Sequence, residues 1–106
     1  MPKYLIKASY TAEGAKGLLK DGGSKRRELA EQAMKSAGGK MEAFYFAFGD
    51  TDVFLIVDAP DHASVSAASL AINASGAVRT ETVVLLTPEE IDQAVKKSVT
   101  YRAPGH

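Results

Sequence analysis

The most apolar part of the chain, residues 41–59, alternates with the period of two that is typical of β-strands. In the first half, three Phe residues share one face, whereas Met41 and Tyr45 share the other. The second half, VFLIVDA, is apolar on both faces, which predicts a strand that is covered on both sides. Residues 49–52 have turn composition, so the whole stretch predicts a β-hairpin.

Shorter patterns on either side of the hairpin predict the other elements. Alternating residues predict strands over residues 3–10 and 78–86, and apolar residues at helical spacing predict helices over residues 24–37, 61–75 and 88–98. Residues 11–20 are expected to form a loop with one or two helical turns. The reason is that Gly14 and Gly17 would each cost about 1 kcal/mol in a helix interior.

Polar residues mark where the helices begin and where the domain ends. Ser24 and Asp61 are expected to cap their helices, and Thr87 is followed by Pro and Glu in the pattern of a capping box. The chain has the length of one domain, which we expect to span residues 1–100. Residues 101–106 are expected to form a loose C-terminal tail.

The order of the predicted elements is strand, helix, strand, strand, helix, strand, helix, which indicates an α+β fold. The first six elements match the ferredoxin-like βαββαβ arrangement, in which two helices cover one face of a four-stranded antiparallel sheet. The other face would still present apolar side chains. Either the C-terminal helix folds over this face or another subunit covers it. We expect a second copy of the chain, in a homodimer or higher homo-oligomer formed through the open sheet face.

The balance of charged residues and the absence of Cys exclude several classes of function. Positive and negative side chains balance at 13 each, which argues against binding to nucleic acid or to an anionic membrane surface. No Cys is present, and His62 and His106 cannot alone form a closed metal site, so neither a metal nor another cofactor is expected. No segment has the apolar length of a signal-peptide core or of a membrane span, so a cytoplasmic location is expected.

Four strings spread over the chain are MPKYLIKASYTAEGAKGLLKDGGSKR, MEAFYFAFGDTDV, SLAINASGAVRTETVVLLTPEEID and SVTYRAPG. Together they resemble the GYD-domain family of small bacterial proteins of unknown function. The resemblance implies a ferredoxin-like fold of the dimeric α/β-barrel type, and it implies no particular activity, because fold alone does not fix function. The family motif has Gly, Tyr and Asp at the hairpin turn. Here Gly49 and Asp52 match, and Thr51 stands in the Tyr position.

Two side chains are candidates for catalysis. His62 follows Asp61 and lies four residues after Asp58, and a His close to a carboxylate could act as a general base. Tyr45 could join it in a pocket lined by aromatic residues. The alternative is that His62 is an exposed residue in the first turn of a helix and that the aromatic residues form the core or a subunit interface.

A basic segment is the candidate site for an anion. Ser24, Lys25, Arg26 and Arg27 follow two Gly residues at a predicted helix start. Backbone amides, a hydroxyl and three cations could hold a phosphate or carboxylate there. The spacing of a P-loop is absent, and the alternative is a solvated basic turn.

Two functions are compatible with these patterns. The first is a homo-oligomeric small-molecule binder or cofactor-independent enzyme, with a pocket between the sheet and the helices or between subunits. The second is a structural or regulatory assembly module whose product is the oligomer itself. Replacing Phe54 or Ile56 by Asp is expected to split that assembly. We rank the binder first by analogy with the enzymes and ligand binders that share this fold group.

Overall fold

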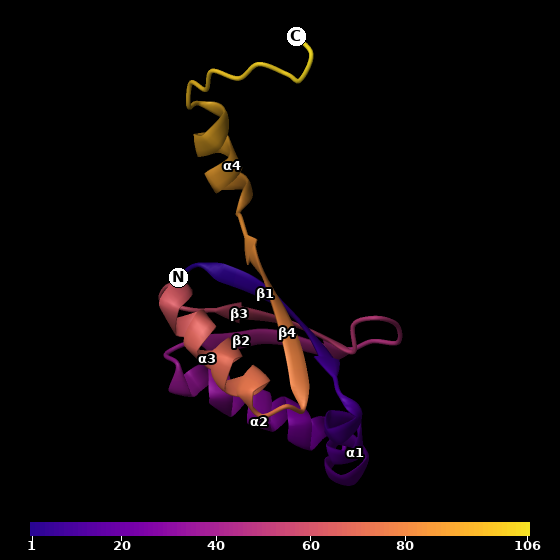
Figure 1. The fold of residues 1–106 in the computed structure, drawn as a ribbon. Helices are drawn as coiled ribbons and strands as arrows, with labels where there is room; N and C mark the ends of the chain where they lie inside the picture. Colours follow the sequence, from indigo (N-terminus) through magenta and orange to yellow (C-terminus); the bar gives the residue numbers. More distant parts are fainter.

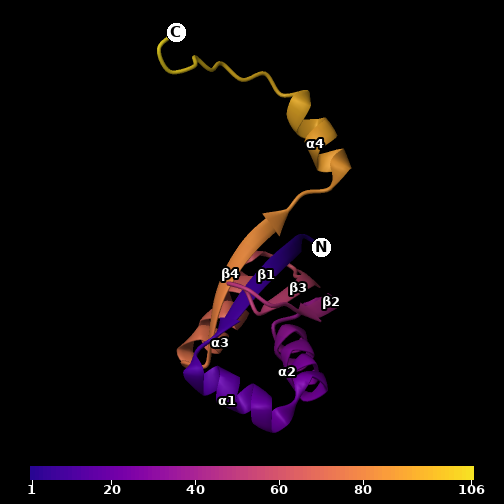
Figure 2. The ribbon, with the colours of Figure 1, turned by 90° about the vertical axis from the view of Figure 1, so that its right-hand side faces the viewer.

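The computed structural model describes residues 1–106 as one four-stranded antiparallel sheet with helices on one of its faces. In chain order the elements are β1 (Lys3–Tyr10), α1 (Ala12–Asp21), α2 (Gly23–Ser36), β2 (Lys40–Phe46), β3 (Val53–Asp58), α3 (His62–Ala74), β4 (Val78–Leu85) and α4 (Pro88–Val95). The strand order is β2-β3-β1-β4, which confirms the predicted ferredoxin-like fold. Figures 1 and 2 show α2 and α3 against the same face of the sheet. None of the helices has the length and apolar content that crossing a membrane requires.

The register of the two central strands places six buried residues on the helix side of the sheet. In opposite pairs they are Tyr4 and Val57, Ile6 and Leu55, and Ala8 and Val53. Met34 of α2 and Val65 and Ala68 of α3 close this core from above. The core therefore lies between the helices and one face of the sheet, where each Å² of apolar surface removed from water contributes about 25 cal/mol.

One extra residue in β2 decides which face Met41 occupies. The register of β2 against β3 shifts between Met41 and Ala43, so Glu42 is the extra residue of a β-bulge. Met41 consequently lies opposite Val57 and packs against the buried core. The prediction that Met41 shares a face with Tyr45 is therefore wrong, because the bulge reverses the alternation on one side of it.

Residues 12–21 form a ten-residue helix, α1, where the two glycines had predicted a loop with one or two helical turns. Thr11 caps this helix by accepting a hydrogen bond from the amide of Gly14. Gly14 also lies against the chain at the start of β4, because a Cβ built on it would be only 2.0 Å from the carbonyl oxygen of Ala77. The glycine therefore lowers helix propensity but permits a close tertiary contact, and this contact allows residues 12–21 to form a helix.

The helix α2 begins one residue earlier than predicted, at Gly23. Gly22 occupies the N-cap position with a φ of +81°, a conformation that other residues rarely adopt, and no side chain caps the helix. The prediction of Ser24 as the cap is therefore wrong. Asp61, in contrast, caps α3 as predicted and accepts a 2.8 Å hydrogen bond from the amide of Ser64.

The last 21 residues, 86–106, stand apart from the sheet, and we call them the C-terminal arm (Figures 1 and 2). Its helix α4 begins with the predicted capping box between Thr87 and Glu90, ends at Val95 and contains no buried residue. The radius of gyration is 16.9 Å, whereas a compact chain of this length has about 13 Å. The C-terminal helix therefore does not fold over the open face of its own sheet.

We expect the substitution Gly14→Ala to lower the free energy of unfolding by about 1–3 kcal/mol, because the new methyl group collides with the Ala77 backbone. Urea denaturation followed by circular dichroism measures this change. Gly17→Ala is the matched control in the same helix, because a Cβ there meets nothing within 4 Å. The control should be neutral or stabilise by up to about 1 kcal/mol. Equal effects of the two substitutions would contradict the packing role of Gly14.

Candidate functional site

The sheet face opposite the helices carries a continuous line of apolar side chains. It crosses all four strands as Ala43, Ile56, Leu5 and Val83, which lie opposite one another in register. We call these four residues the apolar row. The helices α2 and α3 lie on the other side of the sheet, so no helix of the chain covers the row (Figure 2).

The neighbouring line of residues extends the apolar surface and then ends in charge. It consists of Tyr45, Phe54, Lys7 and Glu81, again opposite one another in register. Tyr45 is 71% exposed and Phe54 is 36% exposed, although both are large aromatic residues. The Nζ atom of Lys7 lies 4.0 Å from Oε2 of Glu81. The β2 and β3 side of the face is therefore aromatic, and its β4 side holds an ion pair.

A second group of charges borders the apolar row on its other side. Nζ of Lys3 donates to Oε2 of Glu42 at 2.6 Å and to Oδ1 of Asp58 at 2.9 Å. These hydrogen bonds, first to Glu42 and then to Asp58, raise the pKa of Lys3 above its ordinary value. Lys3 and Lys7 thus each have an acidic partner within the chain, and the row between them is free of charge.

The candidate residue His62 forms a hydrogen bond with a buried tyrosine. The hydroxyl of Tyr4 and Nδ1 of His62 share a hydrogen bond of 2.5 Å, and the two rings meet edge to face with centroids 5.6 Å apart. Tyr4 is only 1% exposed, so His62 supplies the partner that a buried phenol requires. Tyr45 lies on the opposite face of the sheet, and the structure does not bring these two candidates together. The carboxylate of Asp58 is directed toward Lys3 and not toward His62.

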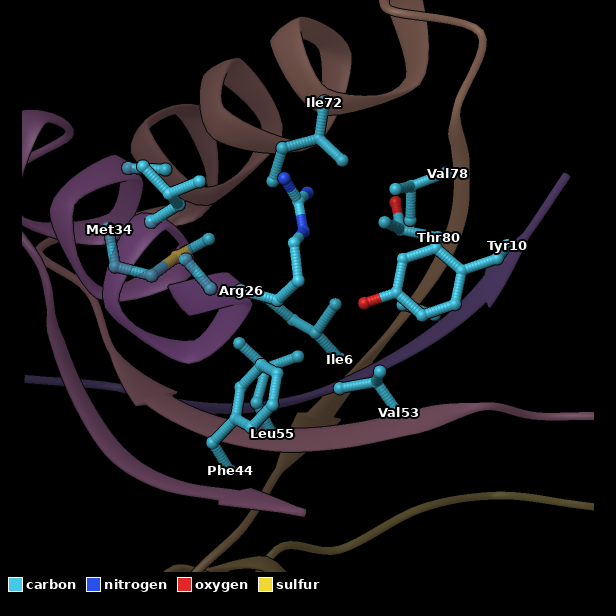
Figure 3. A pocket seen from close by; sticks show the side chains of 14 residues that line it. Ile6, Tyr10, Arg26, Met34, Phe44, Val53, Leu55, Ile72, Val78 and Thr80 are labelled. Carbon is cyan, nitrogen blue, oxygen red and sulfur yellow. The ribbon is translucent and has the colours of Figure 1, made fainter. Parts of the chain in front are cut away.

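The four residues of the basic segment do not share one environment. Ser24, Lys25 and Arg27 are exposed, whereas Arg26 is partly buried. Nη1 of Arg26 lies 3.7 Å from Oδ2 of Asp21, at the end of α1. Arg26 is therefore the one cation of the segment that is directed toward the interior of the domain (Figure 3).

The hairpin turn of the family motif is joined to the end of β1. The Oδ2 atom of Asp52 accepts a 2.8 Å hydrogen bond from the amide of Tyr10, and the amide of Asp52 donates to the carbonyl of Ala8 at 2.9 Å. Gly49 has a positive φ of 151°, and Thr51 is partly buried in the same turn. The observed contacts of Asp52 are therefore structural, because they hold the hairpin in register with the central strand.

A cavity of about 120 Å³ lies between the sheet and the helices α2 and α3, and we call it the Arg26 cavity. Most of its wall is apolar and includes Ile6, Met34, Phe44, Leu55 and Ile72. Arg26 enters it from the first turn of α2, and Tyr10 and Thr80 bring hydroxyl groups (Figure 3). The sequence did not point to Thr80 as a site residue, because it fits the plain alternation of a strand. No three His, Asp or Glu side chains come together in the chain as a metal site requires.

The sequence profile of the GYD domain matches residues 4–95. The chain belongs to the GYD domain family. A relative from Thermus thermophilus is named glutamine synthetase and cystathionine beta-lyase binding protein. It is 29% identical to this chain over 83 residues, which are 78% of this chain and 86% of the relative. The apolar row, the Arg26 cavity and α4 all lie within the part of the chain that matches the GYD domain.

The Asp61 cap makes the stability of this GYD domain depend on pH. Its hydrogen bonds with Ser64 lower the pKa of Asp61 below 3.8, so the charged cap stabilises the fold fully above this value. The contribution is lost as the pH falls through the lowered pKa of the folded state. Asp61→Asn keeps a capping side chain that does not titrate. We expect wild type to melt above this variant at neutral pH, and the difference in Tm to shrink as the pH falls below 3.8 and through the lowered pKa of the folded state. A difference that is independent of pH would contradict this role.

Proposed function

We propose that this GYD domain is a non-catalytic binding module that works as a homo-oligomer, with a second copy of the chain over the open sheet face. The apolar row carries the proposal, because it crosses four strands without a covering helix. Soluble monomers rarely expose contiguous apolar patches beyond a few hundred Å². Two sheets stacked face to face at about 10 Å would remove such a row from water.

The charges of the face support a pairing of two identical surfaces. A two-fold axis brings the same face of each copy together, so any charge on the face is buried twice. A buried charge without a partner strongly destabilises an interface. Lys3 is already paired with Glu42 and Asp58, and Lys7 with Glu81, so the two lysines that border the apolar row would enter the contact with acidic partners.

The C-terminal arm supports a second region of the same contact. Ile91 and Val95 lie on one stripe of α4, and both are exposed, Val95 to 76%. Val99 and Tyr101 continue the exposed apolar side chains beyond the helix. Because the arm stands away from its own domain, the surface that would cover these side chains belongs to another molecule. We place the arm of each copy against the body of the other.

The named relative supports a binding role that includes other proteins. The Thermus protein is named for binding two enzymes, glutamine synthetase and cystathionine beta-lyase. We extend the idea of protein partners to this chain on that likeness, which covers 78% of the chain. Surfaces outside the sheet contact would carry such partners, because the sheet face is used by the second copy.

Small-molecule binding is the second candidate function, and the Arg26 cavity favours it. An apolar space with a few polar groups directed into it is the usual form of a ligand site. The cavity of about 120 Å³ lies at the boundary of the sheet and the helices, within each copy of the chain. A homo-oligomer could therefore hold one ligand per chain without using its subunit contact.

We expect Ile56→Asp or Phe54→Asp to split the oligomer, because each places a new carboxylate within or beside the apolar row, where the contact would remove it from water. Native mass spectrometry of the wild type should show the oligomer, and that of either variant should show mainly monomer. Leu70→Asp is the matched control: Leu70 is 72% exposed on α3, away from the sheet face. A monomeric wild type, or an oligomer unchanged by both sheet substitutions, would refute the proposed contact.

We expect the double substitution Ile91→Asp and Val95→Asp to weaken the oligomer without unfolding the domain, because α4 contains no buried residue. Loss of two apolar contacts should raise the dissociation constant of the oligomer at least about tenfold. Sedimentation velocity over a concentration series measures this constant. Gln93→Asp controls for the new charge in the same helix, outside the apolar stripe. If the double variant and the control have the same dissociation constant, the arm takes no part in the contact.

A further inference from the structure

We infer that the Arg26 cavity binds a small apolar carboxylate, with the Arg26 guanidinium as the counter-ion of the carboxylate group. This inference rests on the small-molecule function proposed above and names the chemical class of the ligand. It concerns a region inside each chain, separate from the sheet face and from the C-terminal arm.

The size and the wall of the cavity define the apolar part of the ligand. The volume of about 120 Å³ is slightly below the volume of about 150 Å³ in which an engineered apolar cavity binds benzene. Ile6, Leu55 and Ile72 form the wall together with Met34 and Phe44. One aromatic ring or one branched alkyl group fits such a space, whereas a nucleotide or a long acyl chain does not.

Arg26 supplies the charge that this ligand must match. Figure 3 shows its side chain reaching into the cavity toward Ile72, with the hydroxyl of Tyr10 directed into the same space. A guanidinium is permanently charged and carries five N–H donors in a planar fork that fits a carboxylate. The contact of Nη1 with Asp21 is 3.7 Å long, beyond the range of a direct hydrogen bond. The donors of Arg26 therefore remain available to a ligand.

Two hydroxyl groups favour an acceptor on the ligand. The Thr80 hydroxyl oxygen accepts a hydrogen bond from the Asn73 side-chain amide at 2.7 Å, which leaves the hydroxyl proton to donate. The hydroxyl of Tyr10 bonds to no other group of the chain, although its backbone amide is held by Asp52. A carboxylate only accepts hydrogen bonds, so it complements these donors as well as Arg26.

The surrounding charges favour a ligand with a single negative charge. Arg26 is the one cation that lines the cavity, and Lys25 and Arg27 are exposed outside it. Asp21 stands close to Arg26 and would repel a doubly charged phosphate. A neutral apolar ligand would fill the space but would cover the N–H donors of the guanidinium without offering them a charged acceptor, and such burial is unfavourable.

The test uses benzoate, phenylacetate and isovalerate as probes, with benzamide as the neutral counterpart of benzoate. Binding to the full chain at neutral pH is measured by saturation-transfer NMR and titration calorimetry. We expect at least one carboxylate to bind, and to bind at least about tenfold more tightly than benzamide. Arg26→Gln should abolish this preference, and Arg27→Gln, on the exposed side of the same turn, should leave it unchanged.

Two further variants separate the possible failures. Tyr10→Phe removes only a hydroxyl and should weaken carboxylate binding several-fold, which tests the site even if Arg26→Gln does not fold. Equal binding of benzoate and benzamide, or equal binding by wild type and Arg26→Gln, would overturn the carboxylate inference and leave the small-molecule function standing. No binding of any probe, together with a wild type whose melting temperature none of them shifts, would overturn both.

Discussion

The pairing of β1 with β3 at the centre of the sheet is the interaction on which the rest of the structure depends. Its register fixes which side chains of both strands turn toward the helices and which turn away. On the helix side it places Tyr4 opposite Val57, two of the most completely buried residues in the chain. On the other side the same pairing places Leu5 opposite Ile56, at the middle of the apolar row. A shift of one residue would exchange the two faces.

This pairing gives the two faces different roles. The helix face is covered by α2 and α3 of the same chain, and the Arg26 cavity lies between these helices and the sheet. The outer face is apolar at its centre and charged at its borders, and it has no covering element within the chain. The proposed functions divide in the same way. Self-association concerns the outer face and the arm, whereas ligand binding concerns the inner face, so one can change without the other.

The sequence predicted the elements that depend on local patterns. Alternation predicted the strands and the two faces of β4, and the polar residues at helix starts predicted the Asp61 cap and the capping box of Thr87. These signals succeed because the residues that carry them act within a few positions of one another.

The features that the sequence did not predict depend on distant contacts. The glycines of α1 have low helix propensity, and only the structure shows that Gly14 packs against the carbonyl of Ala77. Among three adjacent cations, only the position of α2 over the sheet shows that Arg26 turns inward. The candidates His62 and Tyr45 are likewise separated by the sheet itself, which no local pattern reveals.

The strand order also bears on how the chain folds. Only the β2–β3 hairpin joins strands that are neighbours in sequence, and Asp52 ties this hairpin to the end of β1. β4 must pair with β1 across almost the whole length of the domain, and loop closure over such a distance is slow. We therefore expect the hairpin to form early and β4 to dock late. Because the C-terminal arm follows β4 directly, the proposed contact of the arm with a second copy would form only after the sheet is complete, and the topology would then place assembly after folding.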